Sequence, residues 1–179
     1  MAFQRATGYK TSAAAAGGGA ADARTIITRT YEITLAQLQA ITGTTNTWAL
    51  FTLGANEGIR WVWMENSGVA FTGATLYVEV GRSGDTDSLY VQRNLTASGK
   101  VEDDNANAGA DRGAYREMGD SNATAESIGD GAVYYGAEQA IKCLTTTTGG
   151  NHDDLLGGGP IYIHVEIVRV SVADVVAAV

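Results

Sequence analysis

Apolar residues recur at every second position along several short stretches of this 179-residue chain. In ATLYVEV (74–80), Leu76, Val78 and Val80 occupy alternate positions, and SLYVQRNL (88–95) repeats the pattern. Successive side chains of a β-strand point to opposite faces, so a period of two predicts half-buried strands. This alternation constrains the fold more than any other feature, and it predicts an all-β protein.

The chain is expected to form a jelly-roll-like antiparallel β-sandwich, because strand-like stretches recur between glycine-rich and polar loops. The strands are predicted at 24–33, 48–53, 59–66, 74–80, 88–95, 132–136, 138–148 and 160–172. The fourth and fifth are expected to pair as a hairpin across the loop 81–87. One short helix is predicted from the capping-box spacing of Thr34 and Gln37, with its end at Gly43.

Two of the strands carry apolar residues on both faces. In 59–66, Ile59, Trp61 and Trp63 are predicted to share one face, with Val62 and Met64 on the other. A strand that is apolar on both faces is covered on both, so we expect the core on one side and a partner subunit on the other.

The last strand, PIYIHVEIVRVSV, changes its apolar face partway along. Ile161, Ile163, Val165 and Ile167 share one face, and Val168, Val170 and Val172 share the opposite one. One extra residue near Ile167 or Val168, that is, a β-bulge, would produce this change.

The chain is expected to hold one domain at 24–179, preceded by a flexible N-terminal arm at 1–23. The arm, with its SAAAAGGGAADA segment, has neither a period nor bulky residues with which to order itself. Within the domain, residues 97–131 form a long acidic insertion that breaks the strand pattern. An insertion of this length is expected to project from the domain or to lie on a neighbour.

The charge and composition argue against several classes of protein. The net charge is −8, which disfavours binding to nucleic acid. No stretch approaches the ~20 apolar residues that a membrane span needs, and the N-terminus is not expected to be a secretory signal. Cys143 is the one cysteine, so no internal disulfide is expected.

No metal or cofactor site is expected. Asp85 and Asp87 follow Gly84, but a hairpin bend explains them better than calcium, which needs six to eight oxygen ligands. His152 lies beside two aspartates, yet Cys143, His152 and His164 lack the spacing of a zinc site. We therefore interpret the stretch 151–154 as loop polarity.

The sequence also predicts no enzymatic activity. No nucleophile stands in a recognisable triad, and Cys143 is interpreted as a small buried thiol. A hydrolase using Glu102, Asp103 and Asp104 is a remaining hypothesis, although adjacent carboxylates do not make the separated pair that glycoside hydrolysis requires. A sugar-binding platform is another hypothesis, with an exposed ring required among Trp48, Trp61, Trp63, Tyr134 and Tyr135.

The arm, the segment ATLYVEVGRSGDTDSL and the last strand together resemble the small virion proteins of tailed bacteriophages, and most of all their capsid decoration (cement) proteins. The resemblance implies a homo-oligomer, with a trimer favoured, on the outer surface of a capsid whose major subunits it binds and stabilises. It implies synthesis in the host cytoplasm and no enzymatic role. A carbohydrate-binding module, or a fibre, tail or neck component, is the alternative.

If the resemblance holds, contacts with capsid subunits and neighbouring copies are expected at two kinds of position. One is the arm, and the other is strand surface that is apolar on its second face. The residues predicted to make these contacts are Arg5, Tyr9, Lys10, Trp61, Trp63, Val168, Val170 and Val172.

Overall fold

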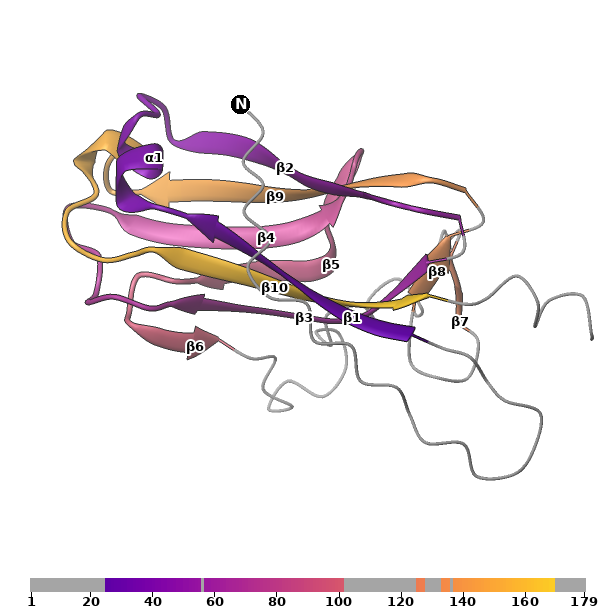
Figure 1. Ribbon diagram of the computed structural model, residues 1–179. Helices are drawn as coiled ribbons and strands as arrows, with labels where there is room; N and C mark the ends of the chain where they lie inside the picture. The colour runs from indigo at the N-terminus through magenta and orange to yellow at the C-terminus, as the bar shows by residue number, and fades with distance from the viewer. Residues whose placement is uncertain (1–24, 56, 102–124, 128–132, 136, 170–179) are drawn as a thin grey trace, which may run out of the picture.

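The computed structural model describes residues 25–55, 57–101, 125–127, 133–135 and 137–169. Within them, the chain forms two antiparallel β-sheets that pack face to face as a sandwich, with one short helix at one end (Figure 1). The all-β sandwich predicted from the alternating pattern is therefore confirmed.

The first sheet, sheet A, has three long strands and three short ones. Its path runs β1–β10–β3–β8–β7, and β6 also pairs with β3. The strands are β1 (Thr25–Ile33), β3 (Glu57–Asn66), β6 (Gly99–Val101), β7 (Ala125–Ser127), β8 (Val133–Tyr135) and β10 (Ile161–Arg169).

The second sheet, sheet B, has four strands in the order β2–β9–β4–β5. They are β2 (Thr45–Leu53), β4 (Thr75–Arg82), β5 (Asp85–Asn94) and β9 (Gln139–Thr148). The eight predicted strands correspond to β1–β5 and β8–β10. The other two, β6 and β7, lie within the predicted acidic insertion at 97–131, so the strand pattern does not break completely there; residues 102–124 and 128–131 of that insertion are outside the described residues.

The strand order identifies the architecture as a jelly roll. Counted in chain order, the eight predicted strands lie as 1-8-3-6 in sheet A and 2-7-4-5 in sheet B. Consecutive strands therefore mostly alternate between the sheets, which is how two Greek keys fold into a double-sheet jelly roll. The connections bring strands far apart in the sequence side by side, as with β1 and β10.

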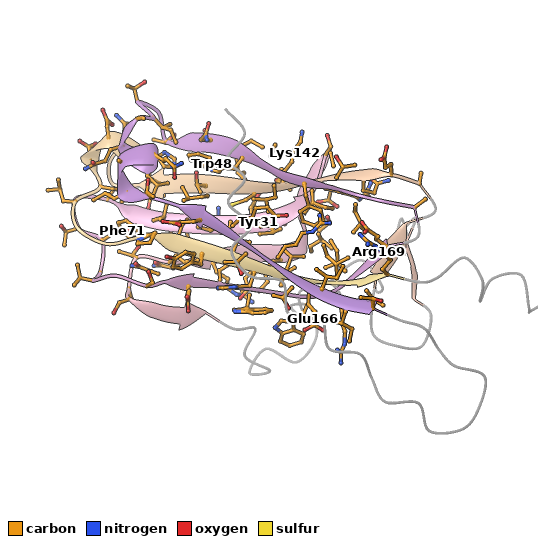
Figure 2. All side chains as sticks on the ribbon, in the orientation of Figure 1. Tyr31, Trp48, Phe71, Lys142, Glu166 and Arg169 are labelled. Carbon is orange, nitrogen blue, oxygen red and sulfur yellow. The ribbon has the colours of Figure 1, made fainter. Side chains whose placement is uncertain are left out.

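The space between the sheets is filled by the alternate residues that the sequence pattern marks as apolar. Ile163 and Val165 on β10, and Leu76 and Val78 on β4, are completely buried. Tyr31 on β1, labelled in Figure 2, stacks on Phe51 of β2 with ring centroids 5.7 Å apart, and so joins the two sheets at one side. Burying one such large side chain contributes about 1.5–3 kcal/mol, so this layer is the main source of stability.

Helix α1 (Leu35–Gln39) forms where the capping box predicts it. The Thr34 side chain accepts a hydrogen bond from the Gln37 N–H, and the Gln37 side chain accepts one from the Thr34 N–H at 2.7 Å. The helix ends at Gln39, earlier than the predicted end at Gly43. Gln39 Nε2 then donates to the Leu155 carbonyl at 2.7 Å, which ties the helix to the loop before β10.

The hairpin between β4 and β5 is confirmed, but its turn is tighter than the predicted loop 81–87. Arg82 pairs with Asp85, which leaves Ser83 and Gly84 as the turn. Gly84 has a φ of 97°, a conformation that glycine adopts without strain. Asp85 therefore lies in strand β5 rather than in a metal-binding loop.

A β-bulge between β10 and β3 lies close to the predicted place but on the other strand. Glu166 pairs with Trp61 whereas Ile167 pairs with Ile59, so the extra residue is Arg60 of β3. The pairing of β10 with β1 has no such shift. The prediction of an extra residue on β10 was therefore wrong, because the sequence does not show which of two paired strands carries it.

The bulge also corrects the predicted faces of β3. Ile59 is completely buried, as is Met64, whereas Trp61 and Trp63 are only partly buried on the opposite face. The inserted Arg60 puts Ile59 on the core side. The prediction that Ile59 shares a face with the two tryptophans was wrong for this reason.

Candidate functional site

The outer side of sheet A carries the densest group of partly exposed aromatic side chains among the described residues. These side chains lie on β3 and β10, whose alternating partners fill the core. We call this surface the outer aromatic face, and it consists of Trp61, Trp63, Glu65, Tyr162, His164 and Glu166. Each of them is partly buried, so each combines packing within the chain with access to a ligand.

Trp63 and His164 form the centre of this face. They are directly paired across β3 and β10, and their rings stack with centroids 4.7 Å apart and planes 7° apart. The His164 Nδ1 atom lies 3.0 Å from the Thr30 hydroxyl, and Nε2 lies 3.7 Å from Glu65 Oε1. The Tyr162 ring lies near the histidine ring, with centroids 6.2 Å apart and planes tilted by 44°. The centre is therefore a rigid platform of packed rings.

Carboxylates border the platform. Glu65 and Glu166 have side chains that are 34% and 22% exposed, so both are available to a ligand. Glu166 accepts a hydrogen bond from Arg60 at 2.8 Å, and Arg60 is the residue inserted by the bulge. A planar aromatic surface with acidic groups at its border fits ligands that combine apolar area with positive charge or with hydrogen-bond donors.

The predicted sugar-binding platform is only partly assembled by this fold. Trp61 and Trp63 lie on the outer aromatic face, whereas Trp48 belongs to the other sheet. The Trp48 Nε1 atom donates to the Thr145 hydroxyl at 3.0 Å, and its ring packs against the core. Tyr134 and Tyr135 lie on β8, which is hydrogen-bonded to β3, and their side chains are outside the description.

His152 is a buried structural residue rather than part of a polar loop surface. It begins the short 3-10 helix η2 (His152–Asp154) and is completely buried. Nδ1 lies 2.7 Å from the Gly43 carbonyl, so this nitrogen carries the proton and donates. Nε2 then accepts from the Thr145 hydroxyl at 3.0 Å. Our interpretation of 151–154 as loop polarity was therefore wrong for His152.

The described residues bring together no group of three His, Cys, Asp or Glu side chains that could hold a metal ion. Cys143 is completely buried on β9, as a small structural thiol should be. Burial and the nearby Glu79 charge both raise the pKa of Cys143, so the thiolate required for nucleophilic attack is disfavoured. Glu102, Asp103 and Asp104 of the hydrolase hypothesis lie outside the described residues.

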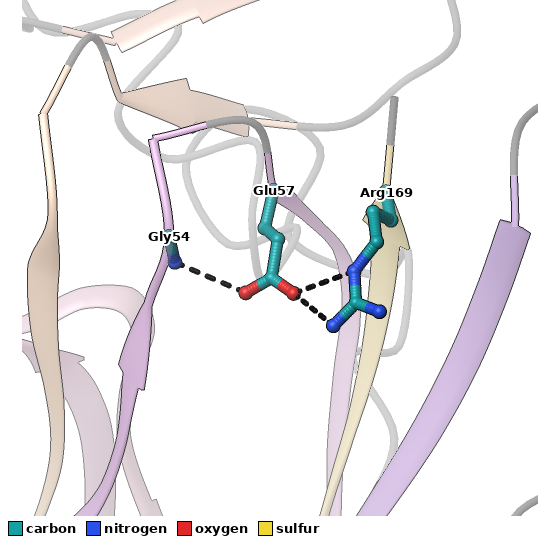
Figure 3. Close-up of polar contacts among 3 residues, drawn as sticks. All are labelled: Gly54, Glu57 and Arg169. Carbon is teal, nitrogen blue, oxygen red and sulfur yellow. Dashed lines mark hydrogen bonds and ion pairs between the residues drawn. The ribbon is translucent and has the colours of Figure 1, made fainter. Parts of the chain in front are cut away.

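A charged cluster lies where the start of β3 pairs with the end of β10 (Figure 3). Glu57, at the start of β3, accepts hydrogen bonds from Arg169 Nε at 2.9 Å and Nη2 at 2.6 Å, and from the Gly54 N–H at 3.0 Å. Burial acts to raise the pKa of Glu57, but these bonds and the charges of Arg169 and Arg29 outweigh it and lower the pKa below 4.5. The cluster connects the β2–β3 turn to β10, which is a structural role.

The predicted contact residues fall into three groups. Trp61 and Trp63 lie on the outer aromatic face, where a neighbour can reach them. Val168 is only 2% exposed, so its side chain is already covered within the chain. The remaining five, Arg5, Tyr9, Lys10, Val170 and Val172, lie outside the described residues.

Sequence reasoning considered His164 only as a zinc ligand and did not single out Tyr162 or Glu166. It did not place them beside Trp61 and Trp63, because cross-strand neighbours depend on which strands pair. The periodicity of each strand was visible in the sequence, whereas the pairing of β3 with β10 was not.

Comparisons with known proteins identify no family. No family model matches the chain, and no curated protein matches it. Among solved structures, a chain described as "Cyanophage Pam1 capsid asymmetric unit" aligns with 14% identity over 88% of this chain and 93% of that chain, with a TM-score of 0.42. That degree of likeness is too low to support an argument about fold or function. Among the described residues, no helix is long and apolar enough to cross a membrane.

Proposed function

We propose that this chain is a non-enzymatic virion structural protein, a capsid decoration (cement) protein that binds major capsid subunits and neighbouring copies of itself. The observation that carries the proposal is the outer aromatic face, a row of partly exposed rings on one sheet of a jelly roll. Two properties of the molecule support it, namely its strand order and the difference between its two outer surfaces.

The strand order supports a role in which the outer surfaces of the fold bind a partner, rather than one in which a cavity holds the reactants of an enzymatic reaction. Double-sheet jelly rolls occur in viral capsid proteins, and also in lectins and cupins. The same fold serves unrelated functions, so the strand order alone does not choose among them. The choice depends on the surface.

The outer surfaces of the two sheets differ in chemistry. Sheet A exposes rings and carboxylates, whereas the outer positions of sheet B at Thr45, Thr47 and Thr146 are threonines that are exposed or partly buried. Figure 2 shows Glu166 and Lys142 on opposite sides of the sandwich. Aromatic residues are enriched in protein interfaces and threonine is uncommon among binding hot spots, so sheet A is the binding side.

The function is tested by adding the purified protein to capsids that lack it and measuring co-sedimentation. The Trp61→Ser/Trp63→Ser double variant is expected to raise the dissociation constant by several hundredfold, since two buried aromatic anchors at ~2 kcal/mol each contribute ~4 kcal/mol together. The matched control is Tyr77→Ser, which changes a partly buried aromatic residue on the outer side of sheet B. Loss of capsid binding in both variants, or in neither, would contradict the proposal.

A second candidate function is carbohydrate binding. It is favoured by Trp63 and Tyr162, whose rings lie next to His164, and by Glu65, whose Oε1 atom lies 3.7 Å from His164 Nε2. Aromatic stacking with flanking carboxylates is a common way to hold a sugar ring. A glycan array distinguishes the two functions: specific glycan signals that disappear in Trp63→Ser favour carbohydrate binding, and an array without signal removes it.

A further inference from the structure

We infer that His164 makes the outer aromatic face respond to pH: near neutrality its ring takes up a proton, and the imidazolium then pairs with Glu65 while it stacks on Trp63. The inference rests on the proposed function in one respect, because it names a regulation of the same face. The protonation itself requires no partner, so it can be tested on the isolated chain.

The His164 ring contacts a different group through its face and through each of its nitrogens. Trp63 stacks on the face, with centroids 4.7 Å apart and planes 7° apart. Nδ1 lies 3.0 Å from the Thr30 hydroxyl oxygen, and Nε2 lies 3.7 Å from Glu65 Oε1. All three groups therefore experience a change in the charge of the ring.

The hydroxyl of Thr30 allows the ring to gain a proton without moving. In the neutral ring, the nearby Glu65 carboxylate favours a proton on Nε2, and Nδ1 then accepts from the Thr30 hydroxyl. In the imidazolium, Nδ1 also carries a proton and donates to the same oxygen. Thr30 is partly exposed, so its own hydroxyl proton can turn to water. Protonation therefore changes the charge at the centre of the face but not its shape.

The strand register shows which other groups surround His164 on this side of the sheet. Thr30 on β1 and Trp63 on β3 are its direct partners, and the residues two positions away on each strand are its diagonal neighbours. Arg60 bonds to Glu166 at 2.8 Å, so a carboxylate already engages its charge. The titratable and charged groups are Glu32 on β1, Glu65 on β3, Tyr162 and Glu166 on β10, Arg60 beside Glu166, and Lys100 of β6, which is the ladder partner of Glu65.

Two opposing effects act on the charge of the ring. The His164 side chain is 17% exposed, and burial disfavours the charged form. The Glu65 carboxylate favours it, and so does the indole of Trp63, since a cation is attracted to the face of an aromatic ring. Histidine normally changes its charge between about pH 5 and pH 8, and we expect these opposing effects to keep His164 within that range.

Protonation makes the face easier to cover with a bound subunit. The imidazolium gives Glu65 a cationic partner within the chain, and a carboxylate that has such a partner costs less to bury than one that lacks it. We therefore expect capsid binding through this face to become tighter as the pH falls from 8 to 5.5.

The protonation is tested on the isolated full chain with ring-¹³C-labelled histidine, by following the Cε1–H resonances by NMR from pH 5 to pH 9. The His164 resonance is identified by its loss in His164→Gln, or by its nuclear Overhauser contacts to the Trp63 indole. It is expected to titrate with a midpoint between about pH 6 and pH 8.

Two carboxyl variants test the role of Glu65 in this titration. Glu65→Gln is expected to lower the midpoint by about half a pH unit, as the loss of a partly exposed ion pair does. Glu138→Gln is the matched control, because it removes an exposed carboxyl just before β9 of sheet B, and it is expected to leave the midpoint unchanged. A His164 resonance that does not move between pH 5 and pH 9, or a midpoint that Glu65→Gln leaves in place, would overturn the inference.

The effect on binding is measured by co-sedimentation with capsids that lack the protein, at pH 5.5 and at pH 8. For the wild type, the dissociation constant is expected to be about threefold lower at the acidic pH, and for His164→Gln it is expected to be equal at both. The same pH dependence in both chains overturns the regulation by His164 and leaves the virion role intact. No capsid binding at either pH, with a His164 midpoint that shifts in Glu65→Gln, contradicts the proposed function and supports the protonation of His164.

Discussion

Thr145 shows how a single residue can join three parts of this molecule. Its hydroxyl accepts from Trp48 Nε1 on β2 and donates to His152 Nε2 in the loop before β10, both at 3.0 Å. Thr145 itself is completely buried. A buried polar group that loses its partner keeps its desolvation cost, so the hydroxyl is important for the groups around it.

We predict that Thr145→Val, which keeps the shape of the side chain and removes the hydroxyl, lowers the free energy of unfolding by about 1–3 kcal/mol. Urea denaturation followed by tryptophan fluorescence measures the change. Thr146→Val is the matched control on the outer side of β9, and it is expected to change stability by less than about 0.5 kcal/mol. Equal effects of the two substitutions would show that the hydrogen bonds of Thr145 do not matter.

Cys143 is predicted to be inert in the folded protein. Burial keeps a reagent from reaching the sulfur. Burial and the charge of Glu79 also raise the pKa of Cys143, so the reactive thiolate is disfavoured. Iodoacetamide at pH 8, followed by mass spectrometry, is expected to leave the native chain unmodified and to alkylate it fully in denaturant. Alkylation of the native chain at the rate of the denatured chain would contradict the buried position.

At the scale of helices and strands, patterns among adjacent residues predicted more of the structure than could be predicted about which strands pair. The alternating pattern identified eight strands, seven of them long, and Thr34 with Gln37 identified helix α1, because both are properties of adjacent residues. The bulge at Arg60 was assigned to the wrong strand, since its position is a property of the pair β3 and β10. The candidate site depends on the same pairing, so its two tryptophans were predicted and their neighbour His164 was not.

The Glu57 cluster connects the β2–β3 turn to β10, and the ionisation of Glu57 makes the stabilisation from this connection depend on pH. Because the folded-state pKa of Glu57 is lowered, its contribution to stability is fully present above the unfolded value near 4.5 and is lost as the pH falls through the lower folded value. Glu57→Gln is therefore expected to be less stable than the wild type at pH 7, by about 1 kcal/mol because Arg169 is half exposed.

The two proteins are expected to approach equal stability as the pH falls through the lowered folded-state pKa of Glu57, once the wild-type carboxyl is protonated. Thermal unfolding of both chains between pH 3 and pH 7 measures this convergence. Glu166→Gln, in the ion pair with Arg60, is the comparison, and it is expected to show a smaller difference at pH 7 because the Glu166 side chain is more exposed than that of Glu57. A difference for Glu57→Gln that stays constant with pH would rule out the charge as its cause.

At the scale of the whole molecule, the jelly roll uses different residues for stability and for binding. The alternate residues of β3 and β10 that point inward hold the sandwich together, whereas those that point outward form the aromatic face. Substitutions on that face should therefore change assembly without unfolding the chain, which makes the face accessible to direct tests. The three tryptophans report on this separation, because Trp48 packs against the core and Trp61 and Trp63 do not.

We predict that self-association protects Trp61 and Trp63, but not Trp48, from a quencher in solution. Three variants that each keep one tryptophan and carry phenylalanine at the other two positions would be titrated with acrylamide at low and high protein concentration. The quenching constants of the Trp61 and Trp63 reporters are expected to fall at least twofold as copies associate, since an interface core excludes water. The Trp48 reporter serves as the internal control, because its ring lies in the other sheet and bonds to Thr145 at every concentration. Protection of Trp48 alone, or of all three to the same extent, would place the contact elsewhere than on the outer side of sheet A.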